Sequence, residues 1–164
     1  MRKGEVQIYT GDGKGKSTAA FGLCLRALGH GHRVRVVQFL KAERCGEHVM
    51  AEKIGLKVSQ CPMGRKSGPC ARPCPLFIEA QKILEENAAD LLVLDELMAA
   101  IRHGCVTLDE ALSLLDKRPE NTEIVMTGRR APRELAKRAT LVTSMEKVKH
   151  FFDAGVPARE GIEY

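Results

Sequence analysis

Short apolar runs alternate along this chain with longer stretches in which apolar residues recur every three or four positions. The short runs are typical of buried strands, and the periodic stretches are typical of helices that cover a sheet. Strands that alternate with helices favour a parallel sheet. We therefore predict an α/β fold whose mostly parallel sheet is flanked by helices on both faces. The predicted strands are 6–9, 34–40, 56–60, 91–94, 123–126 and 141–144, and the predicted helices are 16–28, 47–53, 76–89, 97–102, 108–115 and one that opens at Pro132.

A local signal marks the start of one predicted helix. Thr107 is followed three residues later by Glu110, which is the capping-box pattern of a helix that starts at 108. Two segments have no period: residues 61–75, which are rich in proline and cysteine and are predicted to form a loop, and the tail 148–164. Because no linker or repeat interrupts the pattern, we predict a single domain over residues 1–164.

Composition narrows the class of protein. Hydrophobic residues make up 44% of the chain and charged residues 29%, which is typical of a folded globular protein and not of a disordered one. No apolar run is long enough for a membrane helix, and the first residues do not form a signal peptide, so we expect a cytoplasmic protein without a membrane partner. The 26 basic and 21 acidic residues give a net charge of +5, which favours anionic partners. Aromatic residues are only 4%, so stacking on nucleic acid is disfavoured and a phosphorylated small molecule is preferred.

A glycine-rich segment lies between the first predicted strand and the first predicted helix, which is the context of a phosphate-binding P-loop. Its backbone N–H groups can turn toward phosphate oxygens, and the helix N-terminus adds partial positive charge at the same place. Lys16 is expected to bridge phosphates, and the Ser17 hydroxyl is expected to bind Mg²⁺. The segment reads Gly11, Asp12, Gly13, Lys14, Gly15, Lys16, Ser17 and Thr18.

The match to a standard P-loop is imperfect, because Thr10 stands where the first glycine is expected. A glycine-rich turn without a ligand and a dinucleotide-binding turn are the alternatives. The second is disfavoured because the predicted strand 34–40 carries Gln38 and Phe39 where an acidic ribose ligand is expected.

Polar residues follow three other predicted strands, and parallel strands end at one edge of a sheet. Asp95 and Glu96 follow the apolar strand 91–94, where a carboxylate can hold Mg²⁺ directly or through water; a favourable helix N-terminus is the structural alternative. Arg129 follows the strand 123–126 and is a candidate clamp on a triphosphate, with a solvated surface arginine as the alternative. After the second strand, the candidates that face the site are Gln38, Lys41 and Glu47.

These motifs resemble the ATP:corrinoid adenosyltransferases of the CobA/CobO/BtuR type, nearly from end to end. The off-pattern phosphate loop and the tail are far more specific than a P-loop alone. The segments that carry the resemblance are 9–22, 27–31, 37–41, 46–47, 94–96, 127–129 and 148–164.

The resemblance implies a P-loop NTPase-like, RecA-like fold and a reaction in which Co(I) of a corrinoid attacks the 5′ carbon of ATP and triphosphate leaves. ATP is then a cosubstrate, the corrinoid a substrate, and Mg²⁺ (or Mn²⁺ in its place) the metal. It implies that residues 11–17 hold the triphosphate, that Ser17 with Glu96 or Asp95 holds the metal, and that Lys16, Glu96 and Arg129 are catalytic. It also implies a homodimer and a reduced flavoprotein as electron donor. Some members carry aromatic residues after the third strand to displace the lower cobalt ligand, whereas residues 63–70 contain none here.

The cysteines leave three interpretations open. Cys61, Cys70 and Cys74 are free thiols in a surface loop, or they have a redox role or bind a metal with Cys45 or His48 as the fourth ligand, or they contact the corrinoid. Disulfides are not expected, because no secretory signal is present.

Three functions are therefore compared. The first is an adenosyltransferase that works in adenosylcobalamin biosynthesis or salvage, and the second is a P-loop ATPase or kinase that acts on another small substrate. The third is a binding module without turnover. We expect the adenosyltransferase, because the phosphate loop, Asp95 with Glu96, and the tail all match.

Overall fold

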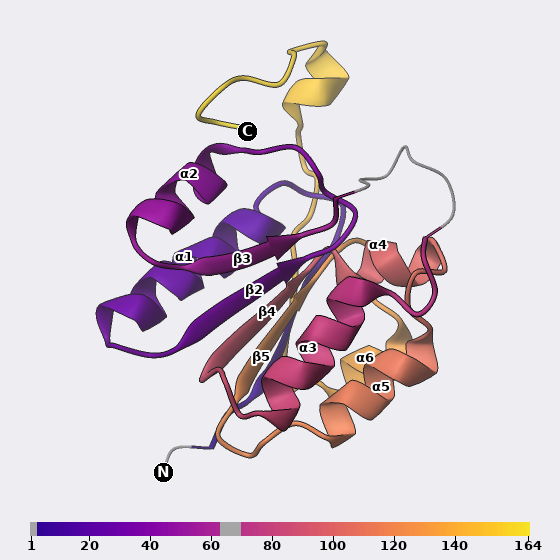
Figure 1. Cartoon of the computed structure of the whole chain (residues 1–164). Helices are drawn as coiled ribbons and strands as arrows, with labels where there is room; N and C mark the ends of the chain where they lie inside the picture. The colour runs from indigo at the N-terminus through magenta and orange to yellow at the C-terminus, as the bar shows by residue number, and fades with distance from the viewer. Residues whose placement is uncertain (1–2, 63–69) are drawn as a thin grey trace.

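The computed structural model describes residues 3–62 and 70–164, and its described strands form one sheet (Figure 1). Every neighbouring pair of strands is parallel, in the order β3-β2-β4-β5-β1-β6. The predicted α/β fold is confirmed, and it is consistent with a P-loop NTPase-like domain. The strands are β1 (Val6–Thr10), β2 (Val34–Gln38), β3 (Lys57–Gln60), β4 (Leu91–Asp95), β5 (Glu123–Thr127) and β6 (Leu141–Ser144).

Helices cover both faces of the sheet, so the central strands are buried on both sides and consist mostly of apolar residues. In Figure 1, α1 and α2 lie on one face, and α3, α4, α5 and α6 lie on the other. Among the described residues, no helix is both long and apolar enough to cross a membrane. The helices are α1 (Lys16–Gly29), α2 (Gly46–Lys53), α3 (Pro75–Glu85), α4 (Leu97–Arg102), α5 (Leu108–Asp116) and α6 (Arg133–Arg138).

Alternation along the strands divides the core into two halves. Val36 of β2 and Val93 of β4 face the side of α1 and α2, whereas Val37 and Leu92 face the side of α3, α4, α5 and α6. All four side chains are at most 1% exposed. Burial on both faces fixes the register, because a shift by one residue would exchange the two sets of side chains.

The strand register brings the predicted site residues to one edge of the sheet. Gln38 of β2 pairs with Asp95 of β4, and Tyr9 of β1 pairs with Thr127 of β5. Because all strands run the same way, the loops that follow β1, β2, β4 and β5 meet at this carboxyl edge.

Most element boundaries agree with the prediction, and the Thr107 capping box is present, with Glu110 as its partner. Two elements end earlier than predicted. The strand β2 stops at Gln38, and Leu40 adopts a left-handed φ of 55°. The helix α3 stops at Glu85, and Asn87 adopts a φ of 47°, although the pattern predicted helix through Ala89.

The tail returns over the carboxyl edge after the exposed edge strand β6 (Figure 1, yellow). The Met145 N–H donates to the Thr10 carbonyl oxygen at 2.8 Å, so the chain passes directly beside the loop that follows β1. A short 3-10 helix, η1 (Phe151–Ala154), is the only regular element within 148–164. Of the predicted loop 61–75, residues 63–69 lie outside the described residues, and these include all but one of the positions 63–70 that were compared with the aromatic-bearing loop of relatives.

Candidate active site

The glycine-rich loop connects β1 to α1 and packs against the segment after β6. Gly15 has a φ of 113° and immediately precedes α1, a left-handed conformation that favours glycine. A Cβ on Gly11 would lie 2.3 Å from the Met145 carbonyl oxygen, and the Gly13 N–H donates to that oxygen at 2.7 Å. Gly11 and Gly13 thus permit close packing of this segment, and Gly13, Gly15 and the first turn of α1 line the neighbouring cavity.

Lys16 begins α1, and its side chain folds back over the loop. Its ammonium group donates to the Gly13 carbonyl oxygen, and the residue is only 9% exposed. Burial lowers the pKa of Lys16, and the nearby guanidinium of Arg129 lowers it further. An anion bound beside both cations would offset this repulsion. The position is therefore suited to a polyphosphate.

Asp95, the last residue of β4, lies at the centre of the site and is completely buried. Its Oδ1 accepts hydrogen bonds from the Ser17 hydroxyl at 2.8 Å and the Thr127 hydroxyl at 2.6 Å. Its Oδ2 accepts one from the Gln38 side-chain amide at 2.8 Å. Three donors from three elements therefore compensate for the burial of this carboxylate.

Glu96 follows directly and adopts a left-handed φ of 60°, which is uncommon for a residue other than glycine. Its N–H donates to the Thr127 hydroxyl oxygen at 2.9 Å. Thr127 thus accepts from Glu96 and donates to Asp95, so that one hydroxyl links both acidic residues. Strained backbone of this kind is concentrated at functional sites.

A cavity of about 580 Å³ opens at this carboxyl edge, a size that suits a nucleotide. Gly11, Gln38 and Asp95 are not part of its lining: Gly11 packs against Met145, and the other two side chains lie buried beneath the floor. The predicted site residues that do line the cavity are Asp12, Gly13, Lys14, Gly15, Lys16, Ser17, Thr18, Lys41, Glu47, Glu96 and Arg129.

Charges around the cavity are partly paired. Lys41 and Glu47 form an ion pair at 2.9 Å, and Arg129 lies 3.7 Å from Asp12. Burial opposes the charged forms of Lys41 and Glu47 and is the largest single influence on each. Their mutual hydrogen bond and charge attraction, with smaller contributions from neighbouring groups, together outweigh it, so the pKa of Lys41 is raised and the pKa of Glu47 is lowered. The described lining carries five Lys or Arg and four Asp or Glu side chains, an excess of one positive charge that favours an anion.

The tail closes one side of the cavity. The Lys14 ammonium group donates to the Ile162 carbonyl oxygen and to the Glu163 carboxylate, each at 2.9 Å. Arg159 pairs with the same carboxylate at 3.1 Å, and together with Lys14 it lowers the pKa of Glu163 to about 2. His150 and residues 161–164 of the tail line the cavity.

Sequence reasoning assigned no role to two residues of the site. Arg102 lines the cavity from the last turn of α4 and donates to the Arg129 carbonyl oxygen. In the sequence it reads only as a basic residue at a helix end. Thr127 is completely buried at the end of β5. The sequence feature that could have indicated a site role for Thr127 is its position as a hydroxyl residue at the carboxyl end of a buried strand, immediately before Gly128.

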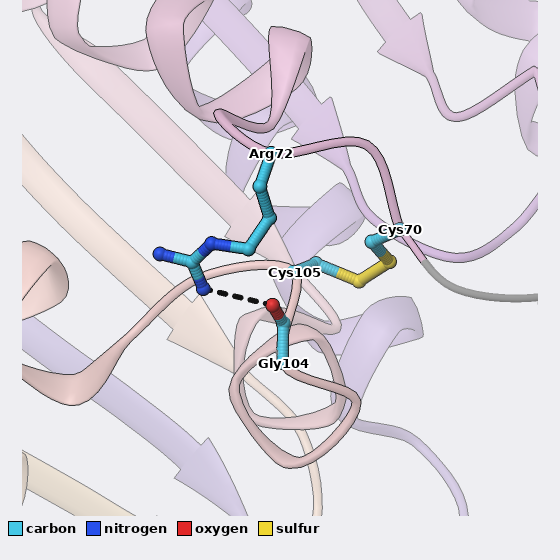
Figure 2. Close-up of a disulfide and its surroundings, with 4 residues drawn as sticks. All are labelled: Cys70, Arg72, Gly104 and Cys105. Carbon is cyan, nitrogen blue, oxygen red and sulfur yellow. Dashed lines mark hydrogen bonds between the residues drawn. A yellow bond between two sulfur atoms is a disulfide. The ribbon is translucent and has the colours of Figure 1, made fainter.

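The cysteine-rich loop differs from the prediction. Figure 2 shows a disulfide between Cys70 and Cys105, whose Cα atoms are 5.0 Å apart. Beside it, Arg72 donates to the Gly104 carbonyl oxygen at 2.9 Å. The expectation that no disulfide forms is therefore wrong. The loop returns onto the turn between α4 and α5, a contact across 35 residues that cysteine spacing does not reveal.

The remaining cysteines do not gather around a metal position. Cys61 and Cys74 have free thiols, and Cys45 is free and buried. Within residues 3–62 and 70–164, no three His, Cys, Asp or Glu side chains are grouped so as to hold a metal ion. His48 is instead buried below the cavity, where its Nε2 lies 2.8 Å from the Gln38 side-chain oxygen.

Comparison with known proteins gives matches over almost the whole chain. The family model described as ATP:corrinoid adenosyltransferase BtuR/CobO/CobP matches residues 2–164. A protein named Corrinoid adenosyltransferase from Escherichia coli strain K12 is 35% identical over 169 residues, which cover 99% of this chain and 86% of the relative. One of the same name from Pseudomonas aeruginosa is 37% identical, over 99% of this chain and 84% of the relative. Corrinoid adenosyltransferase CobA from Salmonella typhimurium is 36% identical, over 99% and 86%.

Proposed function

The chain belongs to the ATP:corrinoid adenosyltransferase family, and from this premise we propose how its cavity carries out the transfer. In the reaction, the electron pair of Co(I) forms a bond to the 5′ carbon of ATP. The bond between that carbon and its oxygen breaks, and triphosphate leaves with the electron pair. The corrinoid supplies the nucleophile, so the protein's task is to position the 5′ carbon and to stabilise the leaving group.

The observation that carries the proposal is the meeting of Lys16, Ser17, Glu96 and Arg129 at one cavity above the first turn of α1. The first amides of a helix have no carbonyl partner within the helix and bind anions readily. Together with Lys16 and Arg129, they would hold the triphosphate as negative charge develops on it. Arg102, beside Arg129, adds a further cation to the same wall.

The residues present fit Mg²⁺, because this ion prefers oxygen ligands and retains several waters. Both oxygens of Asp95 already accept hydrogen bonds, one of them from the Ser17 hydroxyl. We assign Ser17 and Glu96 as the residues that would hold the ion, and Asp95 as the group that holds Ser17. When bound, Mg²⁺ would offset part of the negative charge of the triphosphate.

The tail is proposed to limit water in the cavity. Residues 161–164 line it, and Lys14 holds them through the Ile162 carbonyl oxygen and Glu163. Exclusion of water protects a strongly reducing nucleophile and strengthens the electrostatic interactions within the site.

Three further assignments complete the proposal. A homodimer is supported by exposed apolar side chains on the edge strand and the tail, such as Leu141, Val142 and Phe152, with exposed fractions of 43%, 47% and 81%. Reduction of the corrinoid cobalt to Co(I) requires an electron donor, for which we propose a reduced flavoprotein. The cytoplasm, where ATP is made available, is the proposed location, and residues 1–164 are proposed to act as a single domain.

The test supplies Mg-ATP and a chemically reduced corrinoid, either cobalamin or an early precursor, and follows adenosylcorrinoid by its absorbance. We expect product with the wild type and a loss of roughly 10²–10³ in rate for Lys16→Ala, because one preorganised charge contact is removed. Lys53→Ala, an exposed lysine outside the cavity, is the matched control. Formation of ADP or of a phosphorylated product alone would instead indicate an ATPase or kinase, and ATP binding without turnover would indicate a binding module.

A further inference from the structure

A row of buried polar side chains lies directly beneath the cavity floor. Gln38 and Asp95 are completely buried, and His48 is 5% exposed. Of the six buried polar or charged residues within the described chain, four belong to this row or donate to it: Gln38, His48, Asp95 and Thr127. Of the other two, Lys16 lines the cavity, and Thr122 donates to the Ala89 carbonyl oxygen. Such groups are costly to bury, so their arrangement requires an explanation beyond packing.

The hydrogen bonds in this row have one direction. The Cys45 N–H donates to His48 Nδ1 at 2.9 Å, so the imidazole proton must be on Nε2. Nε2 then donates to the Gln38 side-chain oxygen at 2.8 Å. With its oxygen accepting, Gln38 presents its amide nitrogen to Asp95 Oδ2 at 2.8 Å. Each step fixes the orientation of the next group, from the backbone at the start of α2 to the carboxylate at the end of β4.

This row decides how the Ser17 hydroxyl is presented. Asp95 Oδ1 accepts a hydrogen bond from the Ser17 hydroxyl at 2.8 Å, which leaves the oxygen lone pairs of Ser17 available to the cavity. If the carboxylate rotated, Ser17 would lose this acceptor, and its lone pairs would no longer be held toward a ligand. The Thr127 hydroxyl also donates to Asp95 Oδ1, and the Gln38 side-chain amide donates to Asp95 Oδ2, so the rotation of the carboxylate depends on both.

We propose that His48 and Gln38 are positioning residues for Ser17, and that the Nε2–H tautomer of His48 sets the rotation of the Asp95 carboxylate. The proposal rests on the proposed function, since it concerns the binding of Mg-ATP at this site. Neither side chain touches the cavity, so both act through Asp95.

Two polar substitutions at one position separate this role from a purely structural one. In His48→Gln, the side-chain amide nitrogen can occupy the place of Nε2 and still donate to Gln38. In His48→Asn, the shorter side chain can still accept from the Cys45 N–H but cannot reach Gln38. Gln60→Met is the matched control, because the Gln60 amide donates to the same Gln38 oxygen at 3.1 Å without being part of the row.

Equilibrium binding of ATP, measured with Mg²⁺ and again with EDTA and no corrinoid, is the first readout. We expect His48→Asn to weaken Mg-ATP binding by roughly tenfold or more, as is usual when an outer support of a metal site is lost. In His48→Asn, the binding of ATP without metal should change less than twofold. The variants His48→Gln and Gln60→Met should bind Mg-ATP within about twofold of the wild type. Equal binding by His48→Asn and His48→Gln, or an equal loss with and without Mg²⁺, would overturn the proposal.

Nitrogen-15 NMR of the wild-type histidines is a second readout that needs no variant to fold. The proposal requires a proton on Nε2 of His48 and a hydrogen-bonded, unprotonated Nδ1 at pH 8; the opposite tautomer would overturn it. A wild type that binds Mg-ATP but forms no adenosylcorrinoid would reject only the proposed function. A wild type that binds no Mg-ATP would reject both.

Discussion

Replacement of Thr127 by valine tests the hydrogen bonds that join the two acidic residues of the site. Valine has the shape of threonine but no hydroxyl, so it removes the donor to Asp95 Oδ1 at 2.6 Å and the acceptor of the Glu96 N–H at 2.9 Å. A hydrogen bond to a charged group contributes about 1.5–3 kcal/mol, and a buried donor without a partner costs about 1–3 kcal/mol. We therefore expect Thr127→Val to lower the free energy of unfolding by about 3 kcal/mol.

Urea unfolding at equilibrium measures this change, and a thermal melt checks it. For a domain of this size, about 3 kcal/mol corresponds to a decrease in Tm of about 6–12 °C. Thr127→Ser keeps the hydroxyl and loses only a buried methyl group, so about 1 kcal/mol is expected. If Thr127→Val lies within 0.5 kcal/mol of the wild type, a margin of about the error of such measurements, or if serine is as destabilising as valine, the reasoning is refuted.

Three further predictions concern other parts of the molecule. Burial lowers the pKa of His48 below its ordinary value of 6.5, so the stability contributed by the neutral imidazole is fully present above pH 6.5 and Tm should fall as the pH decreases below that value. His48→Gln should remove this part of the pH dependence. If the dependence of Tm on pH is the same in His48→Gln as in the wild type, the prediction is contradicted. Lys14→Ala removes the contact of the loop with Glu163, so limited proteolysis should cut the tail faster, and an unchanged cleavage rate would show that Lys14 does not hold it. Thiol titration of the unfolded, unreduced protein should find four of the six cysteines, and six after reduction; six before reduction would exclude the bond between Cys70 and Cys105.

The fold was predictable because strong local signals coincide with the tertiary structure. The strands that are buried on both faces contain little except apolar residues, and Thr107 with Glu110 marks the start of α5 correctly. The end of α3 was missed because Ala88 and Ala89 continue a favourable helical pattern. Asn87 ends the helix instead, by adopting a left-handed φ that its short polar side chain tolerates.

The cavity residues were predictable where the phosphate-loop motif, or the segment that follows a predicted strand, lies at the carboxyl edge of the sheet. Lys16 and Ser17 follow from the loop between strand and helix, and Glu96 follows from the end of a buried strand. Gln38 also ends a strand, but β2 is buried on both faces, so the pattern could not tell whether its side chain reaches the cavity or lies under it. The packing of Gly13 against Met145 depends on a contact over more than a hundred residues, to which no local pattern is sensitive.

Phosphorus-31 NMR of a complete reaction tests the central claim most directly, because it identifies the bond of ATP that breaks. With reduced corrinoid and Mg-ATP, we expect free triphosphate to accumulate in equal amount to the new cobalt–carbon product, with no ADP. Accumulation of ADP and orthophosphate, with no adenosyl group on cobalt, would contradict the account.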